Sequence, residues 1–379
     1  MGNGAIKPRR TAKFLAILVV ATIAVTLVEV GLHILWHNPY RNESPDHLVK
    51  LRMHHPESDR VLDRSVIDTD NARVRLRTDK RSYILPSFQY SDPDATVAFL
   101  GGSTTECSIV EEELRFPALV SRLLKADGLN VNTLNAARSG NTVHDSLNVF
   151  INHVSFDSPD VVVLMHASND IGILSHARDY RSRTGHPVST RDLAKWAAQM
   201  ASQKFYFFAL IRHVATTTRA QGGQVDRTDW RYSQQPFDDE LARAFRQKLL
   251  AFVQVSRALE IEPVLMTQPF SGSTNALTPD WLNGTAQDQF NIIIREVGKD
   301  QRVLVIDLVE YLQQNVPDWD EPMAVFYDAI HVTDRGSQLY ATHISSKLKM
   351  LLKEQLPRTS TGALTHLQIQ REEQVGQDD

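Results

Sequence analysis

The sequence predicts an α/β fold: a three-layer α/β/α sandwich of the flavodoxin-like kind, with a five-stranded parallel sheet and one N-terminal transmembrane helix. Three observations predict it. Short apolar runs alternate with amphipathic stretches between residues 95 and 351. The apolar runs are continuous, which is typical of strands covered on both faces. A much longer apolar run, residues 14–36, precedes them.

Five short apolar segments are predicted as strands. The clearest is DVVVLMHA, which is continuous and rich in β-branched residues. Amphipathic segments with helical spacing lie between the strands, and a last one carries apolar residues from 339 to 351. Such alternation is typical of a doubly wound sheet. The predicted strands are 95–101, 130–137, 160–167, 261–268 and 302–308.

The apolar run of residues 14–36 is predicted as a membrane anchor. Its 23 residues span roughly 34 Å as a helix, enough for a hydrocarbon core of about 30 Å. Basic residues between 7 and 13 place the N-terminus in the cytoplasm and the rest on the periplasmic, extracellular or lumenal side. Glu29 and His33, one turn apart, weaken this interpretation. A cleaved signal peptide is the alternative, although no cleavage site closely follows the run.

The remaining parts follow from composition. Residues 37–92 are polar and are predicted as a juxtamembrane stem, and 93–356 as the α/β domain. Within it, residues 171–237 interrupt the alternation and are predicted as an insertion or lid. The flanking segments are a cytoplasmic N-terminus, 1–13, and a disordered tail, 357–379.

Charge and cysteine content exclude several classes of protein. The net charge of −4 leaves no basic excess for binding nucleic acid. The single cysteine, Cys107, can form neither an internal disulfide nor a cysteine zinc site. His54, His55 and His186 lack partners at metal-ligand spacing, so we expect no metal and no cofactor.

Polar residues follow the predicted strands at the sheet edge where parallel sheets bind ligands. Ser103 follows the first strand, Gly140 the second and Asn169 the third, and Asp328 and His331 precede the last helix. A hydroxyl, a base, an acid and oxyanion donors form a complete set for acyl transfer. Each motif alone is more often a turn or a helix cap, but their joint order favours catalysis. 

His166 at the end of the third predicted strand has two interpretations. It either lines the pocket or is a structural residue, and the sequence does not choose between them.

Four sequence blocks resemble those of the SGNH (GDSL-like) hydrolase family. They are FLGGST, NAARSGNT, VVVLMHASND and DAIHVTDRGSQLYA, and the resemblance covers roughly residues 95–355. The stretch TDKRSYILPS resembles a membrane-anchored sub-branch. Two positions depart from the family pattern. Gly102 replaces the aspartate of the GDS signature, and Ala167 replaces a glycine.

The resemblance implies a role for each residue at the predicted sheet edge. Ser103 would be the nucleophile, His331 the base and Asp328 the acid that orients it. The Ser103 and Gly140 N–H groups and the Asn169 amide would form the oxyanion hole.

The resemblance implies a serine esterase, a carboxylic ester hydrolase that works through an acyl-enzyme. Because the domain is expected outside the cytoplasm beside a membrane, the expected substrate is an O-acyl ester, in particular an O-acetyl ester, of an envelope glycan or lipid. The expected partners are this substrate and the membrane. Two alternatives stay open: an O-acyltransferase using the same acyl-enzyme, and a non-catalytic glycan-binding or assembly protein. The oligomeric state is not readable from the sequence.

Overall fold

A computed structural model describes residues 8–41, 51–181, 190–222, 237–272 and 284–375. The chain divides into two compact units. One comprises Met1–Lys50 and Gly185–Arg231 and contains the apolar N-terminal helix. The other comprises Leu51–Thr184 and Tyr232–Asp379 and contains the parallel sheet.

The sheet has five parallel strands in the order β4-β3-β5-β6-β7. In chain order this is 2-1-3-4-5, the flavodoxin-like arrangement, so the predicted fold class is confirmed. Each strand lies within or beside a predicted apolar segment. Their bounds are β3 (Ala95–Gly101), β4 (Val131–Asn135), β5 (Val161–Met165), β6 (Glu262–Met266) and β7 (Leu304–Ile306).

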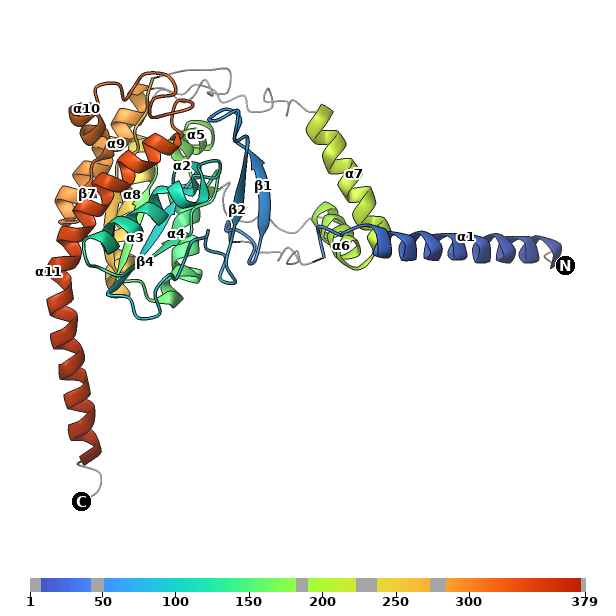
Figure 1. Cartoon of the computed structure of the whole chain (residues 1–379), viewed down its shortest axis with the longest axis horizontal. Coiled ribbons are helices and arrows are strands. Elements are labelled where there is room, and N and C mark those ends of the chain that lie inside the picture. Colours follow the sequence, from blue (N-terminus) through green and yellow to red (C-terminus); the bar gives the residue numbers. More distant parts are fainter. Residues whose placement is uncertain (1–7, 42–50, 182–189, 223–236, 273–283, 376–379) are drawn as a thin grey trace. The chain divides into compact units, whose positions relative to one another are not determined.

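Alternate side chains of each strand enter two separate cores. On β3, Ala98 and Leu100 pack with α4, α8 and α9, whereas Val97 and Phe99 pack with α3, α10 and α11 on the other face. Helices α3 and α11 contact each other on that face (Figure 1). Burial on both faces explains why the strands are continuously apolar.

The helices of this unit alternate with the strands. Their bounds are α2 (Ser103–Glu106), η1 (Glu112–Leu114), α3 (Phe116–Ala126), α4 (Val143–Asn152), η2 (Val154–Asp157), α5 (Ser168–Ala177), α8 (Asp239–Ala258), α9 (Gly284–Gln301), α10 (Leu308–Asn315) and α11 (Asp334–Val375).

The predicted stem, 37–92, differs from the structure from Leu51 onward. That part belongs to the unit of the sheet and contains an antiparallel pair, β1 (Asp59–Asp63) and β2 (Arg73–Arg77). Val74 and Leu76 of β2 are buried, and the arginines between and beside them pair with acidic residues. Buried apolar positions alternate with ion-paired arginines in this stretch, and this mixture has the polar composition that is typical of a stem.

The other unit contains three described helices, α1 (Pro8–Leu35), α6 (Thr190–Lys204) and α7 (Tyr206–Gly222). The apolar part of α1, Ala16–Leu35, is long and apolar enough to cross a membrane. The predicted insertion 171–237 is therefore divided: α5 lies in the unit of the sheet, and α6 and α7 lie with α1. A lid function for the insertion stays a prediction.

The C-terminal tail also differs from the prediction. Helix α11 runs without a break from Asp334 to Val375, through most of the predicted disordered tail 357–379. Glutamine, glutamate and leucine are good helix formers, which favours continuation of the helix although few apolar residues are present.

Candidate active site

Ser103 lies at the carboxyl end of β3, beside the point between β3 and β5 where the strand order reverses. It is the first residue of α2, and Gly101 precedes it by two positions. A Cβ at Gly101 would lie 2.1 Å from Thr105 Oγ1. Glycine is therefore required for the strand to turn sharply into the helix and present the hydroxyl at the sheet edge.

One continuous hydrogen-bonded chain joins Ser103, His331 and Asp328. His331 Nε2 lies 2.7 Å from Ser103 Oγ, and His331 Nδ1 lies 2.7 Å from Asp328 Oδ2. The other carboxylate oxygen of Asp328 accepts the backbone N–H groups of Ile330, at 2.9 Å, and His331, at 2.8 Å. The turn before α11 therefore fixes the carboxylate and the imidazole together, with the serine at the far end.

The electrostatics of this hydrogen-bonded chain favour an ionised Asp328 beside His331. Burial raises the pKa of the Asp328 carboxyl, but the hydrogen bond and the charge of His331 outweigh it, so its pKa lies below the usual value. The ring of Tyr327 stacks on the imidazole of His331, with centroids 5.5 Å apart. The side chain of His331 is 24% exposed, so a ligand can reach it.

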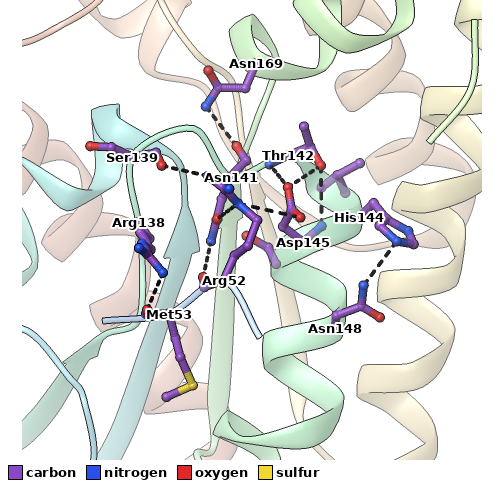
Figure 2. A network of polar contacts seen from close by, with 12 residues as sticks. Arg52, Met53, Arg138, Ser139, Asn141, Thr142, His144, Asp145, Asn148 and Asn169 are labelled. Carbon is purple, nitrogen blue, oxygen red and sulfur yellow. Dashed lines mark hydrogen bonds and ion pairs between the residues drawn. The ribbon is translucent and has the colours of Figure 1, made fainter. Parts of the chain in front are cut away.

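Gly140 lies on the loop that follows β4, and Asn169 lies in the first turn of α5, which follows β5. Gly140 has a φ of +77°, in the left-handed region that favours glycine. Asn169 Nδ2 donates to the carbonyl of Asn141, 2.8 Å away (Figure 2). This bond uses one of the two N–H groups of the Asn169 amide. The bond orients the Asn169 side chain. Among the described residues, no hydrogen bond uses the second N–H group of the amide, so this donor can reach a ligand.

The GDSL-like Lipase/Acylhydrolase family model matches residues 99–339, which include all of these residues. The chain belongs to this family. It is therefore a carboxylic ester hydrolase that acts on acyl esters.

Solved structures similar to this GDSL-like hydrolase include two esterases of acetylated xylan and one acylhydrolase. The acetyl xylan esterase AlAXEase is 20% identical, with a TM-score of 0.42 over 66% of this chain and 98% of that chain. The acetylxylan esterase Axe2 of Geobacillus stearothermophilus is 16% identical, with a TM-score of 0.41 over 66% and 92%. The lipase/acylhydrolase of Enterococcus faecalis is 18% identical, with a TM-score of 0.42 over 70% and 96%. Among curated proteins, a sequence comparison finds no match.

Gly102, where the GDS signature has an aspartate, is crowded in this GDSL-like hydrolase. A Cβ at this position would lie 2.4 Å from Asn169 Nδ2 and 3.2 Å from the carbonyl oxygen of Asn141. The missing side chain thus lets the Asn169 amide lie directly against the turn that carries Ser103. The second departure, Ala167, is completely buried at the end of β5.

Glu106 holds the loop of Gly140 from behind the nucleophile. One of its carboxylate oxygens accepts the backbone N–H of Ser139 at 3.0 Å and also the hydroxyl of Ser139. The other lies 2.8 Å from His54 Nε2. A buried acid three residues after Ser103 was the available sequence signal, but acids near a helix start are too common for that signal to be specific.

Arg52 also contacts this loop, and the sequence alone did not predict this contact. Its Nη2 donates to the carbonyl of Ser139 at 3.2 Å, and its Nε donates to Asn141 Oδ1 at 3.1 Å. Figure 2 shows Arg52 between these groups and Asp145. No motif marks this arginine, because it lies in the stretch whose composition predicts a stem.

His166 lies in the interior, away from the cavity beside Ser103. Its Nε2 lies 2.8 Å from Ser146 Oγ, and only 3% of the residue is exposed. Burial lowers its pKa to about 3. Of the two open interpretations, this placement favours the structural one.

A small cavity of about 10 Å³ lies beside Ser103 and His331. Apolar groups dominate the remaining wall, which is formed by Thr104, Cys107, Ile109, Val110, Tyr327 and Val332. Within the described ranges, no three His, Cys, Asp or Glu side chains lie together as metal ligands would. The expectation of no metal stays a prediction.

Proposed function

We propose that this GDSL-like hydrolase removes short acyl groups, in particular acetyl groups, from O-acylated glycan or lipid outside the cytoplasm, through an acyl-enzyme on Ser103. The observation that carries this proposal is the hydrogen-bonded chain from Ser103 through His331 to Asp328, with its serine at the ligand-binding edge of the sheet.

In the proposed reaction, His331 Nε2 takes the proton of Ser103 while Oγ bonds to the acyl carbon. The carbonyl oxygen becomes an oxyanion. When the carbonyl re-forms, the bond to the alcohol oxygen breaks, and that oxygen takes the proton from His331. Water then repeats the sequence, releasing the carboxylic acid and restoring Ser103. Asp328, which its hydrogen bonds keep ionised, stabilises the imidazolium in both halves.

The oxyanion would be bound by the N–H groups of Ser103 and Gly140 and by the Asn169 amide. The positive φ of Gly140 and the hydrogen bond from Asn169 to Asn141 support this role, because both fix donors before a substrate arrives. Preorganised donors of this kind contribute about 10²–10³ each to the rate.

The size of the cavity supports a short acyl group. A cavity of about 10 Å³ is roughly large enough to hold one water molecule, which is similar in size to a methyl group. Its apolar lining by Ile109, Val110 and Val332 suits a methyl group.

The attachment of the protein to the membrane depends on α1 remaining as an uncleaved anchor. The exposed apolar side chains of Ala16–Leu35 and the preceding basic residues support a membrane span. Contacts of Glu29 with Tyr206 and Phe207 support retention of this segment, because a cleaved signal peptide would not be expected to complete a later helix.

An ester panel on the full chain tests the proposed function. We expect p-nitrophenyl acetate to be turned over faster than the octanoate, by at least about tenfold, because a small apolar pocket discriminates by chain length. Acetate release from acetylated glycan should proceed in water alone. A preference for octanoate contradicts the short-acyl assignment. Acetyl transfer to an added sugar that outpaces hydrolysis would establish the acyltransferase alternative instead.

A further inference from the structure

Glu29, a charged residue inside the apolar run of α1, caps the helix α7. Its carboxylate accepts the backbone N–H groups of Tyr206, at 2.5 Å, and Phe207, at 2.8 Å. These belong to the first turn of α7, where N–H groups lack partners within the helix and negative charge is favoured. The charge that weakens the prediction of a membrane span is thus the group that attaches α7 to the end of that span.

Further contacts fix α6 and α7 on the last turns of α1. The ring of Tyr206 packs edge-on against His33, with centroids 4.8 Å apart, and Trp36 contacts both Tyr206 and His213. The buried Asn38 donates from Nδ2 to the carbonyl of Ser202 in α6, at 2.9 Å. The pair α6–α7 is therefore attached where the apolar run ends.

The opposite face of α7 is apolar and exposed. Phe205, directly before the helix, and Phe208, Ile211 and Val214 within it follow at three-residue intervals, and each is 49–52% exposed. Tyr206 and Ala209, on the attached face, are buried. Soluble surfaces rarely present so many large apolar side chains together, and a contiguous apolar patch indicates an interaction site.

Cationic and aromatic groups gather near the end of α1 in the same unit. A cavity of about 280 Å³ at the end of α1 is lined by apolar groups of Val30, Ile34 and Tyr206 and by polar groups of Glu29, His33, Arg41, Gln203 and Lys204. Arg212 lies over the ring of Tyr40, 4.1 Å from its centroid. Tryptophan, tyrosine and basic side chains are the residues that proteins place at the level of lipid headgroups.

We propose that α6 and α7 form a membrane-surface element, with the exposed face of α7 (Phe205, Phe208, Ile211 and Val214) inserted among the lipids at the outer end of α1. The hydrogen bonds of Glu29 attach the first turn of α7, where this face begins, to the end of the apolar run, and this position beside the proposed span selects lipid as its occupant. The inference rests on the proposed anchor. The insertion then serves as a second membrane contact, which restricts how the anchored unit is oriented at the bilayer.

A quenching experiment on the full chain in phosphatidylcholine–phosphatidylglycerol vesicles tests this inference. Three variants are made, and each carries an environment-sensitive thiol probe at one position. The positions are Phe208→Cys on α7, Ile23→Cys in the span and Phe156→Cys in the unit of the sheet. Phe156 is the matched control, an exposed apolar residue on η2. The native Cys107 is buried and its pKa is raised by burial to about 12, so it does not compete for the label. Turnover of an aryl acetate verifies that each variant is folded.

We expect the probe at position 208 to be quenched by doxyl-labelled lipid and protected from aqueous iodide, as at position 23, with the reverse at position 156. Quenching of the 208 probe by iodide but not by lipid, with the 23 probe in lipid, overturns the inference and leaves the anchor intact. Protection of the 208 probe from both quenchers also overturns it, because the face is then covered by protein. Recovery of a shortened soluble chain refutes the anchor itself.

Discussion

The edge and the interior of the sheet's unit each hold a serine, a histidine and an aspartate in contact. At the edge, His331 Nε2 lies 2.7 Å from Ser103 Oγ. In the interior, His166 Nε2 lies 2.8 Å from Ser146 Oγ. Residue types and the serine–histidine distance therefore do not distinguish a candidate active site from a structural cluster.

The two clusters differ in the aspartate and in exposure. Asp328 Oδ2 lies 2.7 Å from the imidazole of His331, whereas Asp170 lies 3.5 Å from the imidazole of His166. The carboxylate of Asp170 instead accepts the hydroxyl of Tyr180 and the backbone N–H of Val143. Burial also lowers the pKa of His166 to about 3. A histidine that resists protonation cannot take a proton from serine, so only the edge cluster has the properties of a nucleophile with its base.

Replacement of Ser103 and of Ser146 is expected to give the largest difference in kcat between the two clusters. Ser103→Ala should lower kcat for an aryl acetate by about 10⁴–10⁶, because the nucleophile is lost. Ser146→Ala should leave kcat within about threefold, since a group without access to substrate adds nothing to the chemical step. Steady-state kinetics on both folded variants measure the difference. Equal losses would remove the distinction between the clusters.

Asn169→Ala should have the next largest effect. Removal of one oxyanion donor is expected to lower kcat by about 10²–10³, with little change in KM. Asn148→Ala is the matched control, because the Asn148 amide contacts His144 rather than the Ser103 turn. An Asn169→Ala enzyme as active as this control would show that the amide does not bind the oxyanion.

Glu106→Gln sharpens the comparison, because Glu106 is buried yet supports the site. Loss of its charge should loosen the Ser139 backbone and lower kcat by about 10- to 10²-fold, as small displacements of catalytic groups do. Glu112→Gln, which removes an acid paired with Arg77 outside the site, should leave kcat close to that of the wild type. A Glu106→Gln variant with wild-type kcat would reduce this residue to a packing role.

His166 is expected to affect stability rather than activity. Its folded pKa of about 3 lies below its ordinary value of 6.5, so the unfolded chain binds the proton first as the pH falls. This linkage should lower the free energy of unfolding by about 2 kcal/mol between pH 7 and pH 5. In urea titrations at the two pH values, His166→Gln should lose about 2 kcal/mol less than the wild type. Identical losses of unfolding free energy in the two proteins would contradict the lowered pKa of the buried His166.

The sequence predicted features that depend on local pattern. Continuous apolar strands indicated the sheet, and the order of Ser103, Gly140 and Asn169 along the strands indicated the edge where they meet. Arg52 and the contact of Glu106 with Ser139 were not predictable, because both depend on how a distant segment packs against a loop. His166 stayed undecided for a similar reason, since a strand-end position does not reveal whether the side chain turns inward.

The most direct test of the account maps the serine that reacts with a fluorophosphonate probe. The full chain is labelled at neutral pH, digested, and the modified peptide is identified by mass spectrometry. We expect one stoichiometric adduct on Ser103, absent from Ser103→Ala and retained in Ser146→Ala. An adduct on any other serine, or undiminished labelling of folded Ser103→Ala, would contradict the central claim that the chain from Ser103 through His331 to Asp328 is the catalytic machinery.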